Sequence, residues 1–303
     1  MTTPRLLQAI RSRVLLSDGA MGTQLQLAGL PSGHCGEAWN LDHPDRILNM
    51  QRSYAEAGSD CILTNTFGAS RIMLNRHREG DRTREINQAA VSIARQALNG
   101  NGFVFGDIGP FGGLMEPYGD IARTDVEFAF REQVGALVDA GVDAIIIETQ
   151  TALEELEIAI AASKEAGAPV VIGSVAFDKM LDFEDVRTMM GVSPEQAAEF
   201  MVEHGCDILA LNCGTGIDMK RASDIIRRYR SISGLPTMAQ PNAGQPVLEN
   251  MQVLYKETPE QMAEGFPALL EAGARIIGGC CGSTPDHIRK FRQLLDQYEK
   301  VER

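Results

Sequence analysis

Short apolar runs alternate with longer segments of helical period along the whole chain. Eight runs rich in Val, Ile and Leu are expected to be strands: residues 14–18, 60–65, 103–107, 143–148, 170–175, 207–212, 236–240 and 275–279. The segments between them repeat apolar residues every three or four positions and are expected to be helices: residues 45–57, 83–98, 125–140, 152–166, 194–204, 219–230 and 259–272. The run from Ala144 to Ile147 is apolar at consecutive positions, which is typical of parallel strands covered on both faces.

Eight such units predict an α/β fold, a (β/α)8 or TIM barrel, with a single domain over residues 1–303. A doubly wound open sheet is the alternative, but no Gly-x-Gly-x-x-Gly turn follows the first strand. We expect a preliminary helix in residues 1–13 and a closing helix in residues 285–303. The long connections follow strands, notably at residues 19–42, 109–123, 176–193 and 241–258, so we expect the functional site at the carboxyl ends of the strands.

Composition narrows the classes of partner. The net charge is −13 and the 28 Lys and Arg residues form no dense run, which excludes nucleic acid and anionic membrane surfaces as expected partners. No apolar stretch approaches the roughly 18 residues of a membrane helix, and the start of the chain lacks the apolar core of a signal peptide. We therefore expect a cytoplasmic protein whose six cysteines are thiols, free or bound to metal.

Three cysteines lie at the ends of predicted strands. Cys280 and Cys281 are adjacent in Gly-Gly-Cys-Cys-Gly, and Cys213 ends another strand, whereas Cys61 and Cys206 are expected to be ordinary buried residues. Neighbouring cysteines close only a strained disulfide ring, so the pair is better explained as two ligands on one soft ion. Strands six and eight are alternate strands of the barrel, so their ends can share this ion.

The ligand type indicates the chemistry. Three thiolates and one open position suit catalytic zinc, Zn²⁺, and three anionic sulfurs make a substrate thiol a more natural fourth ligand than water. Zinc would lower the pKa of that thiol from roughly 8.5, so we expect alkyl transfer to sulfur. A structural zinc site would need a fourth protein ligand, and no histidine lies at a predicted strand end. Asn242 is a candidate weak ligand through its amide oxygen, or a turn former in Pro-Asn-Ala-Gly.

Acidic and glycine-rich strand ends predict an amino-acid pocket beside the metal. Asp18 and Glu148 would pair with a substrate ammonium, unless these carboxylates cap loops instead. Gly19, Ala20 and Gly22 would let backbone amides approach a substrate carboxylate. An amino acid that bears a thiol is the simplest ligand that satisfies both halves of the site.

The strand-end motifs together resemble those of the homocysteine S-methyltransferase family, in order and over essentially the whole chain. The motifs are Asp18-Gly19-Ala20-Met21-Gly22-Thr23, Thr64-Asn65-Thr66-Phe67-Gly68, Gly106-Asp107-Ile108-Gly109-Pro110, Glu148-Thr149, Asn212-Cys213, Pro241-Asn242-Ala243-Gly244 and Gly278-Gly279-Cys280-Cys281-Gly282-Ser283-Thr284-Pro285. The resemblance implies a barrel in which Cys213, Cys280 and Cys281 bind zinc and the homocysteine thiolate attacks a donor methyl group. It also implies that Met21, Asn65, Thr66 and Phe67 contact the substrate, with Asp18, Gly19, Ala20 and Glu148.

Family members differ in their methyl donor. The chain looks most like the homocysteine domain of cobalamin-dependent methionine synthase, and Thr149 stands where betaine enzymes carry Tyr, which argues against betaine. The chain stops at Arg303 without folate or cobalamin modules, so we expect the donor to be methylcobalamin on a separate corrinoid protein. S-methylmethionine or S-adenosylmethionine is the alternative.

The donor would reach the zinc-bound sulfur from the open mouth of the barrel. Residues 110–123 and 176–193 are therefore candidate docking or gating loops. Phe67, Phe111, Met115 and Tyr118 would line this approach, or pack against the barrel rim. A non-catalytic zinc- or thiol-binding barrel is the alternative of another class, and a zinc hydrolase is a third interpretation that lacks a histidine ligand set. Homocysteine, selenohomocysteine and related thiols all satisfy the expected pocket.

Overall fold

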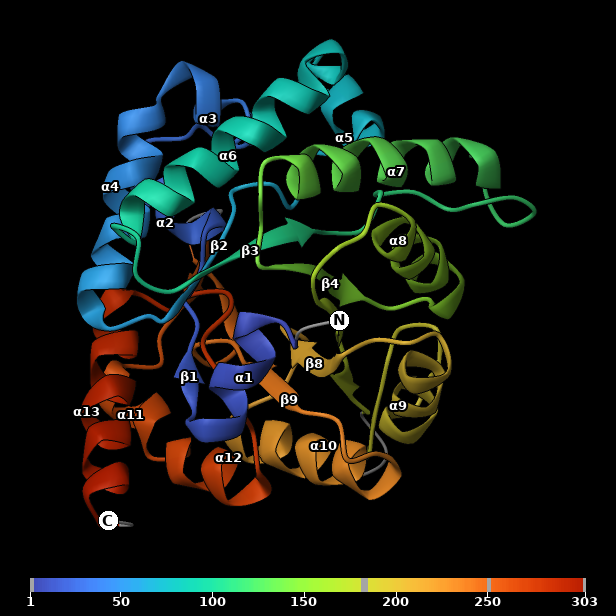
Figure 1. The fold of residues 1–303 in the computed structure, drawn as a ribbon. Helices are drawn as coiled ribbons and strands as arrows, with labels where there is room; N and C mark the ends of the chain where they lie inside the picture. Colours follow the sequence, from blue (N-terminus) through green and yellow to red (C-terminus); the bar gives the residue numbers. More distant parts are fainter. Residues whose placement is uncertain (1–2, 181–184, 250–251, 302–303) are drawn as a thin grey trace.

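Eight parallel strands form one sheet that curls into a barrel (Figure 1). The structure is a computed structural model that describes residues 3–180, 185–249 and 252–301. In spatial order the strands are β1 (Leu15–Leu16), β12 (Ile276–Ile277), β9 (Thr237–Gln240), β8 (Ile208–Asn212), β5 (Val171–Val175), β4 (Ala144–Gln150), β3 (Phe103–Ile108) and β2 (Cys61–Leu63). A parallel bridge between Ser17 and Cys61 joins β1 to β2. The predicted (β/α)8 barrel is confirmed, and every predicted strand is present with shifted or shortened ends.

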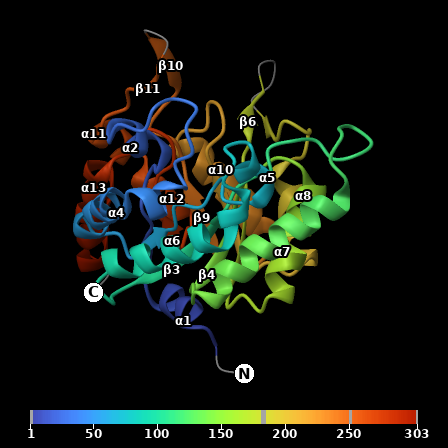
Figure 2. The same ribbon diagram turned by 90° about the horizontal axis from the view of Figure 1, so that it is seen from above.

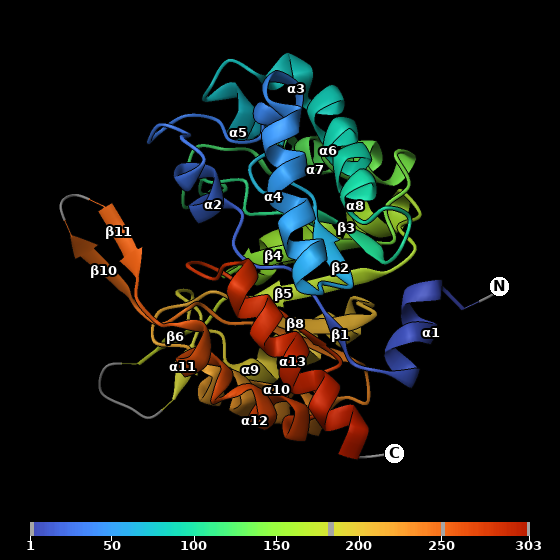
Figure 3. The same ribbon diagram turned by 90° about the vertical axis from the view of Figure 1, so that its left-hand side faces the viewer.

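A layer of helices surrounds the barrel (Figures 1 and 3). These helices are α4 (Pro44–Ala57), α6 (Thr83–Ala97), α7 (Arg123–Asp139), α8 (Leu153–Glu165), α9 (Pro194–Glu203), α10 (Met219–Ile232), α11 (Pro259–Ala263), α12 (Phe266–Ala272) and α13 (Pro285–Val301). The preliminary helix is α1 (Arg5–Ser12), whose Leu6 and Ile10 pack into the apolar interior of the barrel. Cys61 lies in the same buried cluster, which confirms its interpretation as a core residue. Residues 1, 2, 302 and 303 of the predicted terminal helices lie outside the described residues.

The predicted helix over residues 259–272 is wrong as a single element. It divides into α11 and α12 at Gly265. Pro267 sits in the first turn of α12, because proline has no amide hydrogen and its ring clashes with a preceding helical carbonyl. At Gly265 the chain also passes close to α10: an added Cβ would lie 2.3 Å from the Cβ of Met219. The sequence keeps its helical period through Gly265, but the backbone does not continue as a single helix at this residue.

The connections after the strands carry structure that the sequence pattern did not predict. They contain three short helices, α2 (Gly22–Leu27), α3 (Trp39–Asp42) and α5 (Arg71–Asn75), and the 3-10 turn η1 (Gly80–Arg82). They also contain two antiparallel hairpins, β6 (Asp178–Lys179) with β7 (Val186–Arg187) and β10 (Pro246–Glu249) with β11 (Gln252–Tyr255). Both hairpins extend from one end of the barrel (Figure 2), and Figure 3 shows α1 at the other end. Part of the predicted loop over residues 176–193, residues 181–184, lies outside the described residues.

None of the helices within the described part of the chain is long and apolar enough to cross a membrane.

Glu155, in the first turn of α8, anchors the connection that follows β3. Its Oε1 accepts a hydrogen bond from the backbone N–H of Phe111 at 2.7 Å, and the side chain is buried. Phe111 itself is buried in the hydrophobic cluster between the strands and the surrounding helices. Of the two alternatives, lining the donor approach or packing against the barrel, the structure shows the second. Burial raises the pKa of Glu155 from 4.5 to about 7, although the Phe111 N–H acts in the opposite direction. Ionising this group therefore costs stability as the pH rises.

We expect Glu155→Gln to stabilise the protein at pH 8 and to have a smaller effect at pH 5. The folded state holds the proton of Glu155 more tightly than the unfolded state, so the wild type loses stability as the pH rises from about 4.5 to about 7. The glutamine keeps an acceptor for Phe111 and never ionises, so the gain at pH 8 is up to about 3 kcal/mol. Urea unfolding at both pH values measures it. Exposed Glu154→Gln is the matched control, and equal effects of Glu155→Gln at the two pH values would contradict the prediction.

Candidate metal centre and substrate pocket

Three thiols from two strands meet at the carboxyl end of the barrel. Cys213 follows β8, and Cys280 and Cys281 follow β12. The Sγ atom of Cys281 lies 4.0 Å from that of Cys213 and 4.0 Å from that of Cys280, and all three lie within 4.8 Å of one another. Tetrahedral zinc with Zn–S bonds of about 2.3 Å places its sulfur ligands about 3.8 Å apart. The spacing therefore fits one zinc ion with little movement of the side chains.

The three thiols form a hydrogen-bonded group in which Cys213 is the thiolate, and this negative charge favours a bound cation. Hydrogen bonds from Cys280 and Cys281 lower the pKa of Cys213 to about 3. The hydrogen bond with Cys213 is the main reason that the pKa of Cys280 is raised and that the pKa of Cys281 rises to about 11. One thiolate is thus stabilised by two thiol donors. A metal ion that takes all three sulfurs displaces the remaining two protons.

Asn212 links the carboxyl ends of β4 and β8, two strands separated by β5, where two residues have an unusual backbone conformation. Cys213 has a φ of 57° and Thr149 a φ of 59°, values in the left-handed region that non-glycine residues rarely adopt. The Oδ1 of Asn212 accepts from Thr149 N at 2.8 Å, and its Nδ2 donates to Thr149 Oγ1 at 2.7 Å. The same Nδ2 lies 3.4 Å from Glu148 Oε2 and 3.9 Å from Cys280 Sγ. Asn212 was not a predicted site residue, although its place before Cys213 at a strand end was a usable signal.

Asn242 lies in the connection after β9, beside Cys213. Its side chain hydrogen-bonds the Cys213 sulfur, and its Nδ2 donates to Gly214 O at 3.1 Å. Its Oδ1 is buried and has no hydrogen-bond partner among the described residues. A buried amide oxygen without a partner is costly and suits a position beside a cation. The role of Asn242 as a metal ligand stays a prediction that this geometry favours.

Three carboxyl groups form an acidic cluster: the buried Asp18 at the end of β1, the buried Asp107 in β3 and the partly buried Glu148 in β4. Burial raises the pKa of all three, that of Glu148 to about 7 with a further contribution from the charge of Cys213. Asp107 and Glu148 are joined by a side-chain hydrogen bond. Within the described structure, Asp18 Oδ1 and Asp107 Oδ1 have no hydrogen-bond partner. The cluster is therefore suited to a cationic group such as an ammonium.

Asp107 was not predicted as a site residue, although it is the last residue of the predicted strand 103–107 and belongs to one of the strand-end motifs. Its sequence signal was an acidic residue between Gly106 and Ile108 in an otherwise apolar run. Asp18 was predicted, and the structure places its Oδ2 as the acceptor of Leu63 N at 2.9 Å. This bond engages the Oδ2 of Asp18 in joining β1 to β2, while its Oδ1 has no hydrogen-bond partner among the described residues.

The turn after β1 is tied directly to the cysteine turn. The hydroxyl of Ser283 donates to Cys280 O at 2.7 Å and accepts from Ala20 N at 3.1 Å. An added Cβ on Gly19 would lie 2.6 Å from this hydroxyl and 2.9 Å from the Tyr54 ring, so only glycine fits there. The Ala20 amide is therefore engaged within the protein, and contact between this glycine-rich turn and a substrate carboxylate stays a prediction.

Asn65 and Thr66 follow β2 with their side chains engaged by the protein. The Nδ2 of Asn65 donates to Gly36 O at 2.9 Å and to Asn40 Oδ1 at 3.1 Å. Thr66 Oγ1 donates to Asp107 O at 2.7 Å and is fully buried. Both side chains hold connections in place, and their contact with substrate stays a prediction. Phe67 is exposed and lies against Gly109 in the connection that follows β3.

Tyr255, the last residue of β11, was not predicted as a site residue. Its hydroxyl hydrogen-bonds the sulfur of Cys281, and burial followed by the charge of Cys281 raises its pKa. Nothing in its sequence neighbourhood distinguished it from a loop tyrosine.

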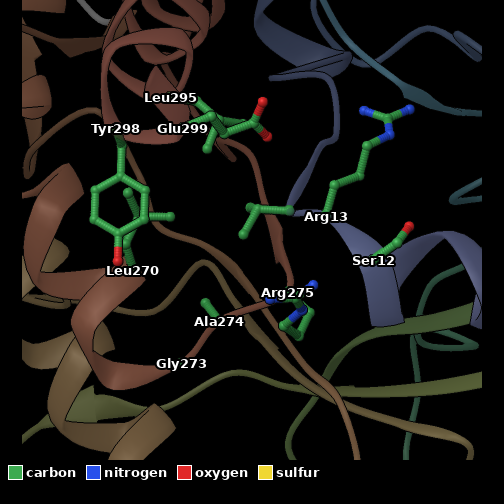
Figure 4. A pocket seen from close by; sticks show the side chains of 10 residues that line it. Ser12, Arg13, Leu270, Gly273, Ala274, Arg275, Leu295, Tyr298 and Glu299 are labelled. Atoms are coloured by element: carbon green, nitrogen blue, oxygen red, sulfur yellow. The ribbon is translucent and has the colours of Figure 1, made fainter. Parts of the chain in front are cut away.

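A cavity of about 410 Å³ lies at the other end of the barrel (Figure 4). It is lined by residues that precede β1 and β12 and by residues of α12 and α13: Ser12, Arg13, Val14, Leu270, Gly273, Ala274, Arg275, Leu295, Tyr298 and Glu299. It contains none of the predicted site residues. The candidate site is therefore identified by the chemistry of its thiol and carboxyl groups rather than by the volume of a cavity.

Comparisons with known proteins give one consistent family. Residues 15–295 match the family model described as homocysteine S-methyltransferase. The chain is 33% identical to a methionine synthase of Mycobacterium tuberculosis, over 98% of this chain and 26% of that protein. It is 34% identical to a methionine synthase of Mycobacterium leprae, over 94% of this chain and 24% of that protein. The chain thus spans about a quarter of the length of these curated relatives.

Among solved structures, the metallated form of the homocysteine methyltransferase MmuM from Escherichia coli has the same fold. The TM-score is 0.76 at 23% identity, over 96% of this chain and 99% of that chain. This likeness supports the barrel.

Proposed function

The chain belongs to the homocysteine S-methyltransferase family, and we propose that it transfers a methyl group to the thiolate of homocysteine, giving methionine. The observation that carries the proposal is the position of the three thiols directly beside the acidic cluster. Asn212 Nδ2 lies within 4 Å of both Glu148 Oε2 and Cys280 Sγ, so one short amino acid can reach both groups. Homocysteine is such an amino acid: its ammonium can lie beside Glu148 while its thiol lies beside Cys280. Family membership favours an enzyme over a non-catalytic thiol-binding barrel and over a zinc hydrolase.

Cys213, Cys280 and Cys281 would hold the zinc, with Asn242 as a candidate fourth ligand. When bound, zinc would lower the pKa of the substrate thiol and keep it as a nucleophile at neutral pH. The protein's own groups orient the acceptor. Asp18, Asp107 and Glu148 would bind its ammonium, and the glycine-rich turn after β1 its carboxylate. Alignment of the sulfur with the incoming methyl group supplies the rest of the rate enhancement.

For the donor, we propose a methylated corrinoid protein that docks at the barrel mouth. Exposed large apolar side chains, which we call the apolar rim, lie on the connection after β3 and on the segments that carry the two hairpins. The apolar rim consists of Leu114, Tyr118, Met180, Met189, Met190, Val247, Leu248, Val253 and Leu254. Exposed apolar surface gathered at one end is typical of a protein interaction site. A small free donor would not require it.

S-methylmethionine is the second candidate donor, and S-adenosylmethionine belongs to the same class. Both are sulfonium cations, and the acidic cluster would attract a cation toward the mouth. The rim argues for the corrinoid protein, and the cluster is compatible with either donor.

We expect zinc-loaded protein to form methionine from homocysteine with a methylated corrinoid protein, and to form none with S-methylmethionine or S-adenosylmethionine alone. Chromatographic detection of methionine measures the product of each donor. Turnover with a sulfonium alone would overturn the corrinoid proposal and leave the homocysteine acceptor in place. Leu248→Ser, in the exposed rim, is the matched variant: it should slow the corrinoid reaction several-fold without loss of zinc. Absence of methionine with all donors would overturn the proposed function.

A further inference from the structure

The connection from β9 to α11 is built around the cysteine turn. Cys280 N donates to Pro241 O at 2.8 Å and Ala243 N donates to Cys281 O at 2.9 Å, so the start of this connection is bound to the backbone of both cysteines. At its other end, Glu257 N donates to Ala243 O at 3.3 Å. The β10–β11 hairpin therefore leaves and returns beside Cys281.

His287, in the first turn of α13, secures the returning strand. Its Nε2 donates to Glu257 O at 3.0 Å, while its Nδ1 accepts from Thr284 N at 3.1 Å. The imidazole is buried, so its two ring nitrogens are fixed in these roles. This contact joins the helix that follows the cysteine turn to the base of the hairpin, two residues after Tyr255.

Tyr255 packs tightly over the cysteine turn. An added Cβ on Gly282 would lie 2.1 Å from the Cβ of Tyr255 and 2.4 Å from its Cγ. Gly282 has a φ of 79°, which also favours glycine. The absent side chain at Gly282 lets the tyrosine ring lie against the backbone next to Cys281. From this position its hydroxyl reaches the Cys281 sulfur.

We propose that Tyr255 is a positioning residue that holds the Cys281 sulfur toward the metal through a hydrogen bond from its hydroxyl. The proposal rests on the proposed zinc site. It assigns a role to the β10–β11 hairpin, which carries Tyr255 at its base and the exposed residues Val247, Leu248, Val253 and Leu254 along its length. A hydrogen bond to a ligand fixes its direction, and loss of such a bond typically weakens metal binding 10–100-fold. The hairpin thus connects the apolar rim to one metal ligand.

The test is Tyr255→Phe, which removes the hydroxyl and leaves the ring that packs on Gly282. We expect it to bind Co²⁺ or Zn²⁺ about tenfold more weakly in competition with a chelator. The thiolate-to-cobalt absorption band should shift, because one sulfur loses a hydrogen-bond donor. The unfolding midpoint of the metal-free protein should not change. The control is Tyr298→Phe, which removes the hydroxyl of a tyrosine that lines the cavity at the opposite end of the barrel (Figure 4) and should match the wild type in metal affinity and in the cobalt band.

Equal metal affinity and an unshifted cobalt band in Tyr255→Phe would overturn the inference. A fall in the stability of the metal-free protein that accounts for the whole loss of metal would also overturn it, because the role would then be structural. If the wild type shows the three-thiolate cobalt band and Tyr255→Phe shifts it and binds the metal more weakly, but the wild type does not methylate homocysteine with any donor, the proposed function is overturned and this inference stays in place.

Discussion

Replacing Cys281 with alanine is expected to abolish tight zinc binding and to lower the rate of homocysteine methylation by more than about a hundredfold. Cys281 is the sulfur that lies 4.0 Å from both other thiols, so its loss leaves two ligands and a gap in the middle of the site. Loss of a residue that only supports a ligand typically costs 10–100-fold, and loss of a ligand should cost more. Metal analysis of the purified variant and the rate of methionine formation measure the two effects.

Cys206→Ala is the matched control for this prediction. Cys206 is a buried free cysteine, whereas Cys281 is partly exposed, and Cys206 precedes β8 and packs near Gly173 rather than at the mouth of the barrel. It should keep its zinc and its activity and lose only the stability that belongs to a truncated core side chain. Full activity in Cys281→Ala would show that the methyl transfer does not require the three-thiolate site. Loss of zinc with retained activity would contradict the proposed thiolate activation.

The barrel and the thiol site were predictable from the sequence because both depend on local patterns. Buried parallel strands are apolar at consecutive positions, and a barrel brings the ends of all its strands to one face. Cys213 and the Cys280–Cys281 pair therefore had to converge once the strands were placed. The 4.0 Å separations confirm that they do.

The residues that the sequence did not reveal depend on contacts between connections. Tyr255 reaches Cys281 only because a hairpin folds back over Gly282, and no periodic pattern predicts that hairpin. Asp107 lies within β3, so its place in the acidic cluster depends on which neighbouring carboxyls face it. Asn65 shows the opposite case: it belongs to a strand-end motif, yet its side chain holds the connection that follows β1.

The acidic cluster places most of the expected substrate specificity on the amino group of the acceptor. Asp18 and Asp107 each keep a buried oxygen without a hydrogen-bond partner in the described structure, and Glu148 is the member linked through Asn212 to the cysteine turn. A bound ammonium would satisfy these oxygens and relieve the cost of holding two buried carboxyls beside the partly buried Glu148. An acceptor that lacks the amino group would leave that cost in place.

Glu148→Gln is accordingly expected to raise the KM for homocysteine about 10- to 100-fold while zinc content stays unchanged. A hydrogen bond to a charged group contributes about 1.5–3 kcal/mol, and the glutamine keeps the shape of the side chain without its charge. Steady-state kinetics with homocysteine and with 4-mercaptobutanoate, which lacks the amino group, separates this effect from a general loss of activity. The wild type should strongly prefer homocysteine, and the variant should lose most of that preference because only the amino-bearing acceptor uses the charge. Glu154→Gln, on the exposed face of α8, should leave the preference intact. An unchanged KM and an unchanged preference in Glu148→Gln would place the ammonium elsewhere in the mouth.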